Sequence, residues 1–205
     1  MIQLFDYWRS TASYRVRIAL ELAGLEWRSV PVNLIDGAQR APEHLERNPQ
    51  GLVPVLEIDG LRLTQSLAIV EYLNETRALR LLPADPAGRA RVRAIAQAIA
   101  VDIHPVCNLR VARHAVTESG GVITMEGWMR AFIGPALEAV ETTLEGGDYC
   151  HGASVSLADL CLVPQLYNAD RWGVDLSAMP KIRRIAATFA HNPAFVAAHP
   201  DRTLH

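Results

Sequence analysis

The character of the chain changes near residue 80, and this change constrains the fold more than any other feature. Before it, short apolar runs typical of strands alternate with helical segments; after it, apolar residues recur at intervals of three and four, which is typical of helices. The segment between the two parts, residues 78–87, contains Pro83 and Pro86 and is expected to be a linker. The sequence therefore predicts two domains, residues 1–77 and residues 88–205.

The first domain is predicted to combine strands and helices. Strands are expected at residues 2–7, 27–33, 52–58 and 61–64, with the turn Asp59-Gly60 joining the last two in a hairpin. Helices are expected at residues 13–23 and at residues 66–75, the second with Ser66 as its N-cap, whereas residues 36–48 are polar and loop-like. The order β-α-β, hairpin, helix is that of a thioredoxin-like α/β domain.

The second domain is predicted to be an all-helical bundle. Its expected helices are residues 89–116, 125–144, 156–172, 180–191 and 193–199. Ser156 and Asp159 resemble a capping box, with Asp in place of the usual Glu, so their expected role is structural. Pro164 lies inside the helix that this box begins and is expected to kink or break it.

Composition narrows the class of protein. With 50% hydrophobic and 20% charged residues the chain is not disordered, and its net charge of −2 does not favour nucleic-acid binding. No uncharged apolar run approaches the ~18 residues of a membrane span, and the N-terminus lacks the apolar run of a signal peptide. The three cysteines are read as reduced thiols of a cytoplasmic protein. Because His104, Cys107 and His114 match no recognised zinc spacing, no metal site is predicted.

Residues 8–20, WRSTASYRVRIAL, resemble the signature of the zeta class of glutathione transferases, SSCSWRVRIAL. Other matching pieces follow in the order of that family: Asn48-Pro49-Gln50, Val53-Pro54, Gln65-Ser66-Leu67-Ala68-Ile69, Leu81-Leu82-Pro83, Ala158-Asp159-Leu160, Val163-Pro164-Gln165 and Val174-Asp175-Leu176. Two of its departures from the signature are Ala12, which replaces the cysteine, and Thr11, which replaces the second serine. No role of that cysteine can therefore operate here.

The resemblance implies the glutathione transferase fold, with glutathione as a cofactor whose thiolate is stabilised at the start of the first helix. Free N–H groups and the helix dipole favour an anion there, and a hydroxyl donor adds to the effect. Ser10 and Thr11 stand at this position and are the expected catalytic residues, with Ser10 as the leading thiolate donor. Both could instead be ordinary N-cap residues. Tyr7 is a rival donor, but it is expected to end a core strand.

The resemblance also assigns the rest of the site. Val53-Pro54 resembles the cis-proline site of thioredoxin-like folds, where the residue before the proline pairs with the tripeptide like an added strand. Gln65 and Ser66 would hold the γ-glutamyl end, and Gln39 would reach the glycyl end. The other assigned residues are Asp102, His104 and Asn108 for the cofactor and Arg9, Arg110 and Arg171 for the substrate carboxylates. A salt-bridged or exposed helix face is the alternative for those from the second domain.

The implied activity is cis–trans isomerisation of a maleyl keto acid, such as maleylacetoacetate or maleylpyruvate. The thiolate adds to the cis double bond, rotation follows, and elimination regenerates glutathione and leaves the fumaryl product. A second enzymatic possibility is conjugation or dehalogenation of α-halo acids, which would consume glutathione, and a third is a non-catalytic binding or structural protein. Recovery of glutathione after turnover distinguishes the three. The resemblance further implies a homodimer that acts on a small molecule.

Overall fold

The computed structural model describes residues 1–203 and divides into two compact units. One unit consists of Met1–Arg80 together with the described residues from His191 onward, and the other is Leu81–Ala190. The C-terminal segment, expected in the helical domain, thus packs on the N-terminal unit. The Tyr14 hydroxyl donates to the Phe195 carbonyl oxygen at 3.1 Å and fixes the segment there. Leu204 and His205, which end the predicted second domain, lie outside the described residues.

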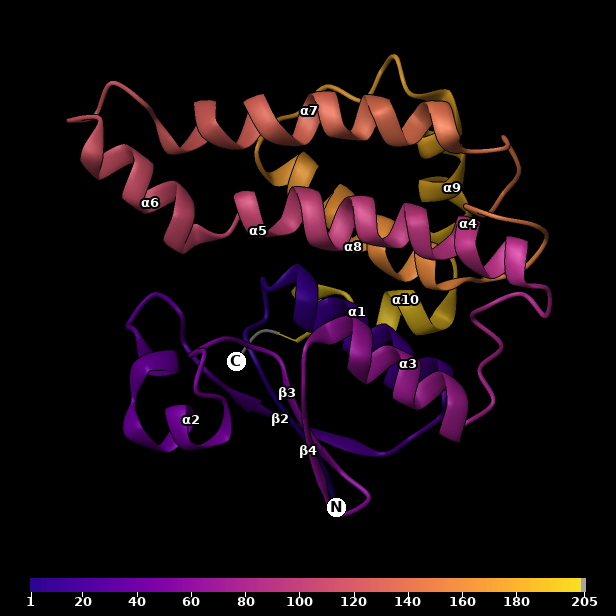
Figure 1. Cartoon of the computed structure of the whole chain (residues 1–205), viewed down its shortest axis with the longest axis horizontal. Helices are drawn as coiled ribbons and strands as arrows, with labels where there is room; N and C mark the ends of the chain where they lie inside the picture. The colour runs from indigo at the N-terminus through magenta and orange to yellow at the C-terminus, as the bar shows by residue number, and fades with distance from the viewer. Residues whose placement is uncertain (204–205) are drawn as a thin grey trace. The chain divides into compact units, whose positions relative to one another are not determined.

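The N-terminal unit is built on a four-stranded mixed sheet in the order β2-β1-β3-β4. Strand β1 (Ile2–Asp6) runs parallel to β2 (Trp27–Pro31) and antiparallel to β3 (Val55–Ile58), which pairs with β4 (Leu61–Thr64) through the predicted hairpin. This topology confirms the thioredoxin-like fold. Figure 1 shows α2 on the opposite side of the strands from α1 and α3.

The helices of this unit depart from the sequence predictions at two places. They are α1 (Thr11–Leu22), η1 (Ala38–Arg40), α2 (Pro42–Arg47), α3 (Ser66–Thr76), α10 (Pro193–Ala197) and η3 (Pro200–Arg202). The loop expected over residues 36–48 was wrong, because η1 and α2 lie there; Pro42 occupies the first helical position, where its missing N–H costs nothing. Ser66 is the first residue of α3 rather than its N-cap, which is Gln65.

The second unit is all-helical, as predicted, but its first long helix is divided. Its elements are α4 (Pro86–Gln97), the π-helical η2 (Ala98–Ile103), α5 (His104–Val106), α6 (Leu109–Glu118), α7 (Met125–Thr143), α8 (Leu157–Arg171) and α9 (Pro180–Phe189). Figure 1 shows α4 and α5 in line, with α7 running alongside them. The single helix expected over residues 89–116 was wrong, because the chain leaves the helical conformation at Asn108, whose backbone is extended and whose side chain caps a new helix.

The capping box of α8 is confirmed. The Ser156 backbone N–H and hydroxyl both donate to Asp159 Oδ2, at 2.8 and 2.7 Å, and the Cys150 N–H donates to Asp159 Oδ1 at 2.8 Å. Burial raises the pKa of Asp159, and these donors oppose that rise. The break expected at Pro164 does not occur; α8 continues through it, with Leu162 and Leu166 buried on either side. None of the described helices combines the length and the apolar character that a membrane span requires.

Candidate active site

Three loops of the N-terminal unit meet at one edge of its sheet. The register pairs Phe5 with Val55 and Val55 with Thr64. Because β3 runs antiparallel to both neighbours, the residues after β1, before β3 and after β4 lie at the same edge. These segments are Trp8–Ser10, Val53–Pro54 and Gln65–Ser66, so the structure brings together the candidates that the sequence took from three separate places.

The N-terminus of α1 lies at this edge and presents Ser10. Ser10 is the N-cap, and its Oγ accepts a hydrogen bond from the Ser13 N–H at 3.2 Å. That bond uses an oxygen lone pair, so the hydroxyl hydrogen can still be donated to an anion. Ser10 is half-buried, whereas Thr11 is 5% exposed and Tyr7 is buried at 8%. The cap role and the donor role are therefore compatible in Ser10, and Tyr7 is a core residue as expected.

The Val53–Pro54 segment is held by side chains to which the sequence had assigned no role. The peptide bond is cis, as predicted. The carbonyl oxygen of Leu52 lies 2.9 Å from both His44 Nε2 and Asn48 Nδ2, and Asn48 Oδ1 accepts from the Gln50 N–H at 3.1 Å. His44 and Asn48 are 3% and 4% exposed. They fix the backbone just before Val53, and the motif Asn48-Pro49-Gln50 was the signal for them.

The N-terminus of α3 completes the edge. Gln65 has φ 67° and ψ 109°, a region that a residue with a side chain rarely adopts and that is typical of functional sites. Its Nε2 donates to Gln50 Oε1 at 2.8 Å. Ser66 is buried, and its Oγ accepts from Arg15 Nη1 at 3.2 Å, which leaves the hydroxyl hydrogen for another acceptor. The arrangement suits a carboxylate at this helix N-terminus.

Gln39 lies beside this edge on η1. It is half-buried, and its Oε1 has no hydrogen-bond partner within residues 1–203. A Cβ built on Gly51, whose φ is +61°, would lie 3.0 Å from the Gln39 carbonyl oxygen. Only glycine permits that approach of the two loops, and the approach sets Gln39 next to the Asn48–Leu52 segment.

The predicted site residues of the second unit lie at separate places among the described residues and do not line one common pocket. Asp102 is exposed and lines a cavity of about 360 Å³ between α4, η2 and α7, whose lining includes none of the other predicted site residues. His104 is half-buried on α5. Asn108 Oδ1 accepts from the Arg110 N–H at 3.0 Å, so Asn108 is the N-cap of α6. Arg171 ends α8, with its guanidinium 4.8 Å from the centre of the Trp172 ring.

The comparisons with known proteins match this geometry. Residues 1–75 match the glutathione S-transferase N-terminal domain family. A maleylacetoacetate isomerase of Rhizobium meliloti (strain 1021) is 59% identical over 204 residues, 97% of this chain and 96% of the relative. The solved structure of a maleyl pyruvate isomerase, described as a bacterial glutathione S-transferase in the zeta class, is 36% identical and covers 98% of both chains with a TM-score of 0.93. The chain belongs to the zeta class of glutathione transferases.

Membership of the zeta class confirms both the resemblance and the glutathione transferase fold. Another structure, of a maleylacetoacetate isomerase from Anaeromyxobacter dehalogenans 2CP-1, was solved with glutathione bound in the active site. It is 42% identical, with a TM-score of 0.88 over 99% of this chain and 96% of that chain. A relative with the same fold thus binds glutathione in its active site.

Proposed function

We propose that this protein is a glutathione-dependent cis–trans isomerase that converts a maleyl keto acid, maleylacetoacetate or maleylpyruvate, into its fumaryl isomer. The observation that carries the assignment is the match over 97% of the chain to relatives named maleylacetoacetate isomerase. The edge formed by α1, β3 and α3 also supports it, because it offers hydroxyl and backbone N–H donors that suit a tripeptide with two carboxylates and a thiol.

The residues at this edge fit glutathione by their chemistry. Val53 precedes the first residue of the β3 ladder by two positions, so its backbone groups can pair with an extended peptide. The buried Ser66 hydroxyl and the N–H groups at the start of α3 suit the γ-glutamyl carboxylate, with Gln65 beside them. The amide of Gln39 suits the glycyl end, and Asp102, His104 and Asn108 are assigned to the cofactor from the helical unit.

Bound glutathione would supply the thiolate that adds to the cis double bond and is eliminated after rotation about the resulting single bond. Ser10 donates its hydroxyl hydrogen to the sulfur, and the free N–H groups of the first turn of α1 add their partial positive charge. Thr11, at the first position of α1, supports the same anion. Ala12 contributes no thiol, so the chain's own residues stabilise the anion without a cysteine.

Arginines are assigned to the carboxylates of the substrate. A maleyl keto acid carries two carboxylates, and a guanidinium binds each with two parallel hydrogen bonds while staying charged at any working pH. Arg9 lies in the loop between β1 and α1. Its guanidinium lies 4.1 Å from the centre of the Trp8 ring, and this contact limits the rotation of the Arg9 side chain. Arg110 and Arg171 are the arginines that the helical unit contributes.

Two broader properties belong to the same proposal. The cysteines Cys107, Cys150 and Cys161 are all free and buried, which suits the reducing cytoplasm where glutathione is abundant. We place the enzyme there as a homodimer, as in the family that it resembles.

The test is to incubate the enzyme with glutathione and either the maleyl keto acid, an α-halo acid or a neutral chloronitrobenzene, and to identify the products. An isomerase gives the fumaryl acid and returns all the glutathione. Formation of a stable conjugate or release of halide as the faster reaction would favour a transferase or dehalogenase. Binding of glutathione without any product would leave a binding protein.

A further inference from the structure

Helix α1 carries two arginines that are almost completely buried. Arg15 is 1% exposed and Arg17 is 0% exposed, although charged side chains are rarely buried to this extent without a specific partner. Residues two positions apart on an α-helix are separated by about 200° around its axis. The two guanidinium groups therefore leave the helix on nearly opposite sides and reach different parts of the N-terminal unit.

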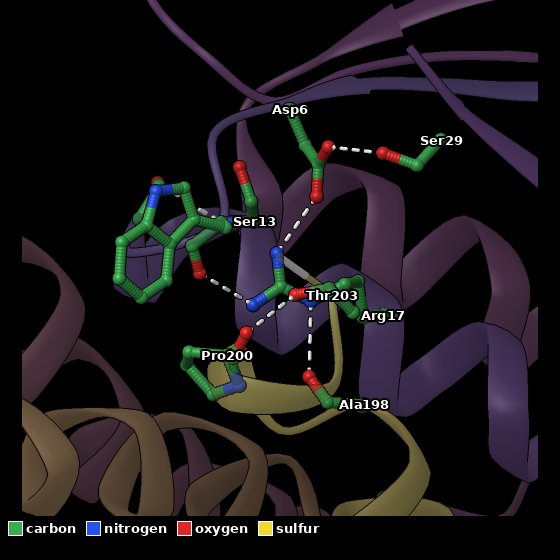
Figure 2. Close-up of polar contacts among 9 residues, drawn as sticks. Asp6, Ser13, Arg17, Ser29, Ala198, Pro200 and Thr203 are labelled. Atoms are coloured by element: carbon green, nitrogen blue, oxygen red, sulfur yellow. Dashed lines mark hydrogen bonds and ion pairs between the residues drawn. The ribbon is translucent and has the colours of Figure 1, made fainter. Parts of the chain in front are cut away.

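Arg17 connects three segments through three separate hydrogen bonds (Figure 2). Its Nη1 donates to Asp6 Oδ2 at 2.7 Å, its Nη2 to the Trp8 carbonyl oxygen at 2.9 Å, and its Nε to the Ala198 carbonyl oxygen at 3.0 Å. Asp6 also accepts from the Ser29 hydroxyl at 2.6 Å. Because both side chains of the Asp6–Arg17 ion pair are fully buried, solvent screens their interaction little.

The bond to Trp8 matters because Trp8 lies two residues before Ser10. The Ser10 N–H donates to the Tyr7 carbonyl oxygen at 2.8 Å, which closes the turn from one side, and Arg17 fixes the Trp8 carbonyl from within the helix. The position of the Ser10 hydroxyl over the start of α1 therefore depends on Arg17. The bond to Ala198 ties the C-terminal segment to the same guanidinium.

Arg15 acts on the other end of the site. Its Nη1 donates to Ser66 Oγ at 3.2 Å, which links α1 to the first residue of α3. A hydroxyl that accepts from a guanidinium turns its own hydrogen away from it, toward a further acceptor. The donor is positively charged, which strengthens this orientation in a buried site.

We propose that Arg15 and Arg17 are positioning residues that divide the glutathione site between them. Arg17 holds the turn that presents Ser10 to the sulfur and so determines the pKa of the glutathione thiol. Arg15 orients the Ser66 hydroxyl toward the γ-glutamyl carboxylate and so sets affinity for the cofactor. This division rests on the proposed function and goes beyond it, since neither arginine contacts the cofactor in this scheme.

The role of Arg17 is tested with the variant Arg17→Lys. Lysine keeps a positive charge beside Asp6 but cannot also donate to the carbonyl oxygens of Trp8 and Ala198 in the geometry of a guanidinium. The pKa of bound glutathione is read from thiolate absorbance against pH. We expect it to rise by about one unit, which lowers kcat at neutral pH by about 10-fold. Ser29→Ala is the matched control, because it removes a hydrogen bond from Asp6 without touching Trp8; it should lower the urea midpoint and leave the thiol pKa unchanged.

The arm for Arg15 is a double-mutant cycle with Ser66. Arg15→Met should raise KM for glutathione by about 10-fold with little change in the thiol pKa, and Arg15→Lys should restore most of the affinity. In a Ser66→Ala background the same Arg15→Met change should have almost no further effect on KM, since Arg15 acts through that hydroxyl. Additive effects in the cycle would overturn the role of Arg15.

Equal thiol pKa values in Arg17→Lys and the wild type would overturn the role of Arg17. If Arg17→Lys does not fold, the double variant Arg17→Gln with Asp6→Asn decides, since it replaces the buried ion pair by two neutral amides and removes the bond to Trp8. It should raise the thiol pKa in the same way, and an unchanged pKa would count against the proposal. A wild-type enzyme that forms no bound thiolate would instead contradict the proposed function, so the two failures are distinguishable.

Discussion

Replacement of Ser10 by alanine removes one oxygen atom that has two roles. In the structure the Ser10 Oγ caps α1 by accepting from the Ser13 N–H at 3.2 Å. In the proposed reaction the same hydroxyl donates its hydrogen to the sulfur of glutathione. Ser10→Ala should therefore lower both the stability of the protein and its turnover, and the two losses can be measured separately.

The size of each loss follows from the chemistry. Loss of an N-cap side chain costs about 1 kcal/mol of unfolding free energy. A hydrogen bond to a charged group contributes about 1.5–3 kcal/mol, and 1.36 kcal/mol corresponds to one pKa unit. We therefore expect the pKa of bound glutathione to rise by about one to two units. Turnover at neutral pH should fall by about 10-fold or more, with a smaller loss for Thr11→Ala.

The assay combines urea unfolding, thiolate absorbance against pH and the isomerase rate for each variant. Thr124→Ala is the matched control, because Thr124 caps α7 in the same way, with its Oγ1 accepting from the Gly127 N–H at 3.0 Å. It should lose similar stability and keep full turnover. A Ser10→Ala enzyme with the wild-type pKa of bound glutathione would refute the donor role and transfer it to Thr11 or to the backbone N–H groups.

Three further outcomes are expected. Arg171→Met should lower turnover of the maleyl keto acid by ~10-fold or more and spare conjugation of a neutral chloronitrobenzene; parallel loss of both would indicate a structural role. Asn48→Ala should raise KM for glutathione several-fold more than it lowers kcat, because Asn48 fixes the Leu52 carbonyl; an unchanged KM in kinetics would contradict this. A thiol reagent should titrate no cysteine in the folded enzyme at neutral pH and all three in urea, since all are buried and burial raises the pKa of Cys107 to about 11; rapid labelling of the folded protein would be the contrary result.

The sequence was sufficient for the parts of the fold that local chemistry determines. Short apolar runs between helical segments predicted the strands, and the turn Asp59-Gly60 predicted the hairpin. The pair Ser156 and Asp159 predicted the start of α8, because a capping box satisfies its own donors within four residues. The cis peptide bond at Val53-Pro54 was predicted from the family resemblance and not from local chemistry, since an X-Pro bond by itself is rarely cis.

The sequence was insufficient where distant segments decide the structure. Arg15 and Arg17 stand in the signature, but a charged residue within a helical pattern is normally placed on the solvent face. Their burial depends on partners at Asp6, Ser66 and Ala198 that no local pattern reveals. The same holds for the C-terminal segment, whose helical pattern does not say on which unit it packs.

In the proposed reaction glutathione is a regenerated cofactor, and its stoichiometry distinguishes this role from that of a consumed substrate. The maleyl keto acid is converted with glutathione at a concentration far below that of the substrate, and the fumaryl product and the remaining glutathione are both quantified. We expect complete conversion with all the glutathione recovered as free thiol. Conversion that stops when product equals the glutathione supplied, with the thiol consumed, would show instead that glutathione is a substrate.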